Sequence, residues 1–500
     1  MKNRLALLCA ALCVTAFTAR PAHAADGDTT PATVPAISVT APAAAPTVAS
    51  AVGASTATTA APAPTGLWDR ATLFGDMGGL RPALADVGIS LGLQETSEVL
   101  GNVTGGTQRG AAYDGLTQLS LGIDGAKAFG LTGAIFNVSA LQIHGSNLST
   151  QNLDNLQMAS NIEADRGTRL WELWYQQTLP GNKVDLKIGQ QSLDQEFMTS
   201  QYAATFINSA FGWPTLAASD LPATGPAYPL SSLGVRVRAQ MSDTVTVLGG
   251  VFDGNPAGTL SGDPQQANAS GTLFNLHNGA LFIAELQYSL NPAPSGDAAN
   301  PANAPDPGLP GTYKIGLWYD TAAVNDPRYD TQGLSLASPL SNGIPAQHQG
   351  DYSIYALADQ MVWRPSVDSP QSVGVFARMT GAPGNRNPLD YSMDAGVVLK
   401  APFKGRDNDV AGLGMGYAHF SGSASGLDQD LQYYSNPAYP VRSGETFFEL
   451  TYQYQVTPWW QIQSDLQYFV NVGGDLPNPV APTQRIGNEL VLGLRTSITF

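Results

Sequence analysis

The chain has 500 residues, of which 43% are hydrophobic and only 13% charged, and its formal net charge is −16. Such an acidic chain lacks the basic surface that nucleic-acid phosphates require, so nucleic acid is excluded as a partner. The 53 glycines and 35 prolines supply many turns, and with the period-two patterns described below they favour an all-β fold.

The first segment reads as a secretory signal. A basic start and the apolar run 5–17 precede an Ala-x-Ala cleavage motif that ends at Ala24. We therefore predict that residues 1–24 are a signal peptide and are removed on secretion. Cys9 and Cys13 lie within this segment, so the mature chain is expected to contain neither a disulfide nor a thiolate metal site.

Two short segments precede the main body of the chain. Residues 25–65 consist almost wholly of Ala, Pro, Thr, Val and Ser, a composition that predicts a disordered tail. The alternative interpretation is a spacer that reaches peptidoglycan or another envelope partner. In the segment 66–86 and just beyond it, Leu80, Leu84 and Val87 recur at helical spacing, which predicts a short N-terminal helix.

Sixteen strand-like segments make up the rest, and their connections are alternately long and short. Such alternation is typical of a membrane barrel with extracellular loops and periplasmic turns, whereas no run of about 18 apolar residues suggests a membrane helix. We predict a sixteen-stranded antiparallel transmembrane β-barrel over 87–500, with long extracellular loops, in the bacterial outer membrane. The segments are 87–99, 113–125, 131–144, 168–179, 183–191, 231–242, 243–253, 279–290, 311–320, 351–363, 370–381, 390–401, 408–420, 443–456, 459–470 and 485–500.

The segment 168–179 shows how the faces are assigned. Trp171 and Leu173 alternate with Glu172 and Trp174, so one face is apolar and the other polar. The last segment alternates in the same way and ends on an aromatic residue, Phe500. A soluble β-sandwich remains as the alternative, although it would need more than a dozen strands without a second core.

Three blocks of sequence resemble the OprB-type carbohydrate-selective porins of Gram-negative outer membranes. They are LFGDMGGLRPALADVGI at 73–89, the block 172–255 with FINSAFGWP, AYPLSSLGVRVR and GVFDGN, and the C-terminal ELTYQYQVTPWWQIQSDLQYFVNVGG through LGLRTSITF. The resemblance implies a monomeric sixteen-stranded barrel that passes sugars by passive diffusion. The chain departs from the family pattern at Met77, where Trp is usual, and at Val472, where Pro is usual.

The candidate pore constriction centres on two arginines. Arg236 and Arg238 lie two residues apart on one strand among apolar neighbours, so both are expected to face the lumen. The guanidinium offers five donors for sugar hydroxyls. Glu172 is inward by the same alternation and could complement the arginines, and Trp174 could stack on a sugar ring.

Further candidates are weaker or depend on how one loop folds. The longest loop, 192–230, is expected to narrow the pore, because a barrel of sixteen strands leaves a wide channel. Its aromatic residues would then line the passage. The weaker lumen candidates are Arg378, Asp465 and Arg495, and the loop aromatics are Phe206, Phe211 and Trp213.

Other functions have little support in the sequence. The mature histidines stand apart without a second ligand at close spacing, so neither a metal site nor a cofactor is predicted, and no enzyme; they are His144, His277, His348 and His419. The expected partners are small sugars, outer-membrane lipid and lipopolysaccharide. Three alternatives stay open: a general diffusion porin, an occluded barrel that serves as a structural or receptor protein, and a hydrolase with a Ser/His pair on the barrel face.

Overall fold

The computed structural model describes residues 66–259, 262–292, 308–479 and 481–500. The predicted signal peptide, 1–24, and the predicted tail, 25–65, lie outside the described residues. Among the described residues, no helix is long and apolar enough to cross a membrane.

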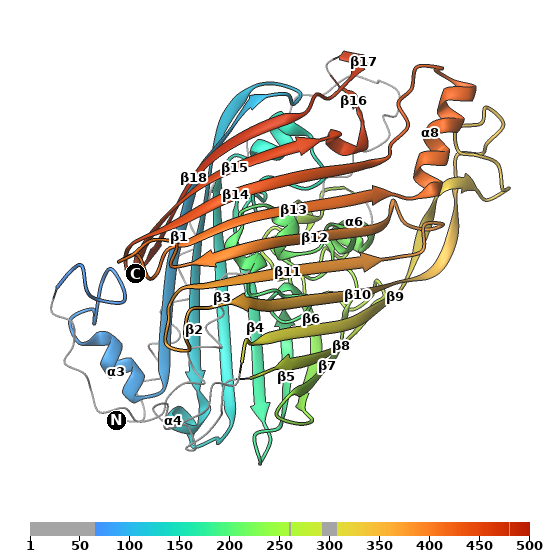
Figure 1. Ribbon diagram of the computed structural model, residues 1–500. Helices are drawn as coiled ribbons and strands as arrows, with labels where there is room; N and C mark the ends of the chain where they lie inside the picture. The colour runs from blue at the N-terminus through green and yellow to red at the C-terminus, as the bar shows by residue number, and fades with distance from the viewer. Residues whose placement is uncertain (1–65, 260–261, 293–307, 480) are drawn as a thin grey trace, which may run out of the picture. The chain divides into compact units, whose positions relative to one another are not determined.

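The described chain forms a closed barrel of sixteen antiparallel strands, in which each strand pairs with its sequence neighbours and β18 closes the ring against β1 (Figure 1). The prediction of a sixteen-stranded antiparallel barrel is thus confirmed. The wall strands are β1 (Ile89–Thr104), β2 (Gly110–Asp124), β3 (Ala134–Gly145), β4 (Gly167–Thr178), β5 (Val184–Gln191), β6 (Ser232–Gln240), β7 (Val245–Asp253), β8 (Ala280–Leu290), β9 (Gly311–Asp330), β10 (Pro345–Trp363), β11 (Ser372–Gly381), β12 (Leu389–Lys400), β13 (Val410–Phe420), β14 (Gly444–Thr457), β15 (Trp460–Val470) and β18 (Glu489–Thr499).

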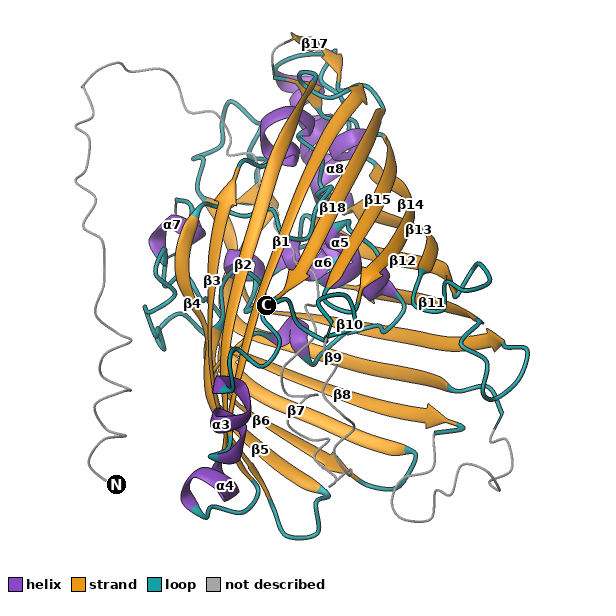
Figure 2. Ribbon diagram, turned by 90° about the vertical axis from the view of Figure 1, so that its left-hand side faces the viewer, coloured by secondary structure: helices purple, strands orange, loops and turns teal. Residues whose placement is uncertain are grey.

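Short helices and one hairpin occupy the connections. Helix α3 lies beside the start of β1, where Arg81 hydrogen-bonds the carbonyl oxygens of Leu91, at 3.4 Å, and of Phe500 (Figure 2). The helices are α3 (Leu80–Asp86), α4 (Gly125–Phe129), α5 (Ser209–Gly212), α6 (Thr215–Asp220), α7 (Pro264–Ala267) and α8 (Gly422–Tyr434), and the hairpin joins β16 (Pro477–Asn478) to β17 (Ala481–Arg485).

Two features of the wall differ from the expectation. β9 and β10 extend past the predicted segments 311–320 and 351–363, because residues near Asn325 pair with residues near Gln347 in a protruding hairpin. On β4, Trp171 faces inward rather than sharing the outer face with Leu173. A register shift opposite Trp171, between Val138 and Ala140 of β3, breaks the alternation there, so Trp171 is buried in the lumen while Leu173 is 46% exposed.

The core of the molecule lies inside the barrel. Two connections fold inward: residues 146–166, here the short inner loop, and residues 192–231, here the long inner loop (Figure 1). Their apolar side chains pack against inward-facing wall residues, as Trp213 does in one cluster with Trp318. The outer wall is instead apolar and exposed, as a lipid-facing surface requires; Leu494 is 56% exposed.

Candidate pore constriction

Wall side chains hold the long inner loop by its backbone. A buried loop must find partners for its peptide groups, and the barrel wall supplies them. Glu449 on β14 accepts the backbone N–H groups of Ile207 at 2.6 Å and Asn208 at 2.9 Å. Three strands along the wall, Arg378 on β11 pairs with Asp394 on β12 at 3.0 Å. Arg378 also donates to the carbonyl oxygens of Met198, Ala210, Phe211 and Gly212, at 2.6–3.2 Å.

The short inner loop is held in the same way. Glu445 on β14 accepts the N–H groups of Leu156 at 2.9 Å and Gln157 at 2.7 Å. Gln467 on β15 donates to the carbonyl oxygen of Ala159 at 2.7 Å. Charged and amide side chains of the wall therefore hold both loops inside the lumen.

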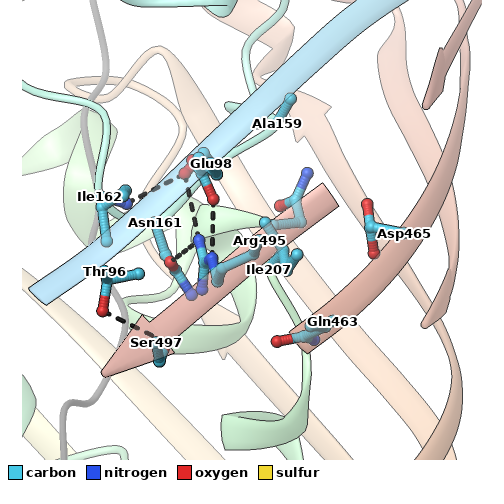
Figure 3. A network of polar contacts seen from close by, with 12 residues as sticks. Thr96, Glu98, Ala159, Asn161, Ile162, Ile207, Gln463, Asp465, Arg495 and Ser497 are labelled. Atoms are coloured by element: carbon cyan, nitrogen blue, oxygen red, sulfur yellow. Dashed lines mark hydrogen bonds and ion pairs between the residues drawn. The ribbon is translucent and has the colours of Figure 1, made fainter. Parts of the chain in front are cut away.

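Figure 3 shows the polar network that ties the short inner loop to the seam between β1 and β18. Arg495 pairs with Glu98 at 2.7 Å and donates to the side-chain oxygen of Asn161 at 2.7 Å. Deeper in the short inner loop, Glu163 accepts the N–H of Ser149 at 3.0 Å. Burial raises the pKa of the Glu163 carboxyl to about 7, although the hydrogen bond from Ser149 lowers it in part.

A cavity of about 140 Å³ lies between these loops and the wall. Amide and hydroxyl groups dominate its polar lining, one guanidinium joins them, and three aromatic rings contribute flat apolar faces. The polar lining residues are Gln94, Thr96, Gln118, Asn161, Gln453, Gln461, Gln463, Arg495 and Ser497, and the aromatic ones are Trp171, Phe206 and Tyr228.

The four residues predicted for the constriction come together on another part of the wall, β4 to β6. Arg236 is only 3% exposed. It pairs with Asp185 on β5 and, through Nε at 2.6 Å, with Glu196 of the long inner loop. Lys187 also pairs with Glu196. Burial alone would raise the pKa of the Glu196 carboxyl, but the neighbouring cations of Lys187 and Arg236 outweigh burial and lower this pKa to about 2. Arg236 thus binds the loop to the wall.

Arg238 differs from its neighbour. Its side chain is 43% exposed and pairs with Asp185 only at 3.8 Å, so a solute can reach its guanidinium. Glu172 is buried and accepts the N–H of Ser192 at 3.3 Å. The ring of Trp174 is covered by the Lys187 ammonium, 4.3 Å from the ring centroid. The described lining of the cavity includes none of the four predicted residues.

The weaker candidates divide between packing and lining. Arg378 anchors the loop, whereas Arg495 lines the cavity. Phe211 packs among wall aromatics, and its ring centroid lies 5.2 Å from that of Phe447. Trp213 is fully buried, whereas Phe206 lines the cavity.

The wall residues of the cavity that the prediction omitted come from both ends of the chain, β1 to β4 and β14 to β18, and the inner loops add Asn161, Ile162, Ala204 and Tyr228. The available signal was the row of inward glutamines, Gln453 on one strand and Gln461 and Gln463 on the next.

Comparison with known proteins gives consistent matches. The model of the carbohydrate-selective porin family, OprB, matches residues 108–500. Porin B of Pseudomonas aeruginosa is 26% identical over 447 residues, which covers 86% of this chain and 91% of that protein. The putative porin QuiX of Acinetobacter baylyi is 24% identical over 455 residues, covering 86% of this chain and 94% of the relative. The high-pH structure of Pseudomonas putida OprB covers 87% of this chain and 99% of its own, with 24% identity and a TM-score of 0.75, which shows the shared fold.

Proposed function

The chain belongs to the OprB family of carbohydrate-selective porins, and from that premise we propose that its lumen passes monosaccharides and other small carbohydrates by passive, selective diffusion. The chain is an outer-membrane porin for carbohydrates. Its family and fold indicate a channel rather than an enzyme. Which sugars pass, and which residues select them, belongs to the proposal.

The cavity between the inner loops and the wall is the observation that carries the proposal. A neutral sugar offers hydroxyl groups that both donate and accept hydrogen bonds, and ring faces that are largely apolar. Glutamine amides match the hydroxyls because each offers two donors and an acceptor, and the cavity combines several of them with the rings of Trp171 and Tyr228. A charged solute would lose hydrating water on entry, and the cavity lining offers few opposite charges to replace it.

We place the second selective element on the wall of β4 to β6. Arg238 is the guanidinium that a permeating sugar can reach, since its side chain is 43% exposed. Arg236, Glu172 and Trp174 complete this side of the constriction. Arg236 and Glu172 act by fixing the long inner loop, because Arg236 pairs with Glu196 and Glu172 accepts the N–H of Ser192.

Conductance in planar bilayers tests the proposal. The refolded barrel is inserted, and glucose, maltose and longer saccharides are titrated against the open-channel current. We expect a concentration-dependent block by small sugars. Open channels without block would support a general diffusion porin instead, and a barrel that forms no channel would support an occluded structural or receptor protein.

The remaining elements of the proposal concern the cell envelope. We propose secretion through the signal peptide 1–24, a tail at 25–65 that contacts peptidoglycan or another envelope component, a helical segment at 66–86 and a barrel domain at 87–500. We also propose that the porin acts as a monomer, a view supported by the ring that one chain closes by itself. Sugars are its permeants, and lipid and lipopolysaccharide surround it.

A further inference from the structure

One side of the lumen is closed by the long inner loop. On β13 the inward positions include Gly412 and Gly414, and a Cβ at either would meet the ring of Phe206. At Gly374 on β11 a Cβ would meet the ring of Tyr202. Aromatic rings of the loop therefore lie directly on the wall backbone of these strands. We expect a solute to pass instead where the loop leaves the cavity open.

Several polar side chains of the cavity already hold the inner loops. Gln453 and Gln463 both donate to the carbonyl oxygen of Thr205 in the long inner loop, at 3.1 and 2.8 Å. Arg495 donates to the side-chain oxygen of Asn161 in the short inner loop at 2.7 Å. These four cavity side chains are therefore committed to the loops before a sugar arrives.

The other glutamines of the cavity keep free hydrogen-bonding groups. Within the part of the chain that the structure describes, the Gln118 amide has no side-chain hydrogen-bond partner. Gln94 donates to the Thr96 hydroxyl at 3.3 Å, and Gln461 donates to Oε1 of Gln455 at 3.4 Å. The amide oxygens of Gln94 and Gln461 accept no hydrogen bond from the described residues. All three glutamines are half-buried, so a solute in the cavity can reach them.

Strand register places these side chains in one row on the inner wall. Gln118 on β2 is the direct partner of Gln94 on β1. Gln94 in turn lies two residues from the position opposite Ser497 on β18. Ser497 is the direct partner of Gln461 on β15, and Gln461 pairs diagonally within the β14–β15 hairpin with Gln455, its direct partner on β14. We call this row of five side chains the glutamine belt; it crosses five neighbouring strands and contains no ionisable group.

The glutamine belt lies toward the end of the barrel opposite the entry of the inner loops. At that end the β4–β5, β6–β7 and β14–β15 connections are only 179–183, 241–244 and 458–459. Both inner loops, 146–166 and 192–231, begin at the other end. Short connections of an outer-membrane barrel face the periplasm. A solute that has passed the inner loops from outside therefore meets the belt before it leaves the lumen.

We propose that the glutamine belt is a track that binds short linear saccharides by hydrogen bonds during passage, with successive sugar units on neighbouring strands. Neighbouring strands are about 4.8 Å apart, which is close to the length that each pyranose unit adds to a linear saccharide. Each amide offers two donors and an acceptor, so it matches a hydroxyl in either role. The inference rests on the proposed function, because it names the substrate class and the path through the same lumen.

Two further properties of the belt suit passage rather than tight binding. Hydrogen bonds between neutral groups are about half as strong as those to ions, so a bound sugar is released readily. Wall strands of such barrels are tilted by roughly 40°, so a row that crosses the strands also advances along the pore axis. A saccharide that moves from strand to strand along the belt therefore moves toward the exit.

Sugar block of single channels tests the track. Glucose and maltose are titrated against the open-channel current of the wild type, Gln118→Met and Gln118→Met/Gln461→Met. In the wild type the half-block concentration should fall by about fivefold from glucose to maltose, the effect of one further neutral hydrogen bond. Gln118→Met should lose part of this gain and the double variant all of it. Block by glucose should change little in Gln118→Met, because one sugar unit can occupy the remaining amides.

Gln240→Met is the matched control. Gln240 is half-buried and shares the inward face of β6 with Arg236, outside the belt. Its substitution removes one lumen amide and should leave the gain from glucose to maltose at the wild-type value. Heat-dependent gel mobility and open-channel conductance show whether the barrel and the inner loops are unchanged in each variant.

The outcomes separate the track from the pore itself. Equal half-block concentrations of glucose and maltose in the wild type would overturn the track and leave the sugar porin standing. A wild-type gain in Gln118→Met/Gln461→Met would do the same. Absence of block by either sugar in the wild type would overturn the track together with the proposed function.

Discussion

Removing the guanidinium of Arg378 should release the long inner loop without opening the barrel. Arg378 is buried, pairs with Asp394 and donates to four loop carbonyl groups. In Arg378→Met all of these hydrogen bonds are lost and Asp394 is left buried without its cation. The strands keep their own ladder of hydrogen bonds, so the loop rather than the wall should respond.

The free-energy cost of the substitution can be worked out from the Arg378–Asp394 ion pair alone. Breaking a buried ion pair by removing one partner costs about 3–5 kcal/mol, and each carbonyl left without a donor adds to that cost unless water reaches it. A loss of about 3 kcal/mol raises the population of the released loop by roughly two orders of magnitude. Arg378→Met/Asp394→Leu removes both charges and should recover part of the loss.

Single-channel conductance and limited proteolysis give the readout. Arg378→Met should conduct more than the wild type, lose sugar block and be cut within 192–231, while its heat-dependent gel mobility still reports a folded barrel. The double variant should fall between the two. Wild-type conductance together with wild-type resistance to proteolysis in Arg378→Met would refute the view that the wall anchors this loop.

Three further predictions concern single residues. Arg238→Ala should weaken sugar block by about tenfold, the value of one hydrogen bond from a charged donor, and unchanged half-block concentrations would remove it from the site. Because the pKa of Glu196 is about 2, below its usual 4.5, its ion pairs stabilise the long inner loop above pH 4.5, and this stability is lost as the pH falls toward 2; Glu196→Gln should remove that acid dependence of proteolysis. Because the pKa of Glu163 is raised to about 7, its neutral form stabilises the short inner loop below pH 4.5, and this stability is lost as the pH rises through 7. Glu163→Gln should flatten the change measured by hydrogen exchange, and an unchanged profile would contradict its assignment to Glu163.

The local alternation of apolar and polar residues was sufficient to predict the wall strands of the barrel. A strand that separates lipid from a polar lumen must alternate with period two, so each wall segment carries its own signal. The same logic failed at Trp171, because the register shift on β3 is a property of two paired strands. It also missed the outer half of the β9–β10 hairpin, where the residues that pair, such as Asn325 and Gln347, have no apolar face to distinguish.

The site depended on contacts that no local pattern contains. The sequence alone determined a sixteen-stranded barrel, its inward arginines and a long loop able to narrow it. Only the tertiary structure decided that Arg236 forms ion pairs with Asp185 and Glu196 while Arg238 stays exposed. Closure of the ring brings β1 to β4 beside β14 to β18, which joins glutamines from both ends of the chain around one cavity. Alternation tells which way a side chain points, but the partner it meets depends on strand register and loop packing, which are set by residues far away in sequence.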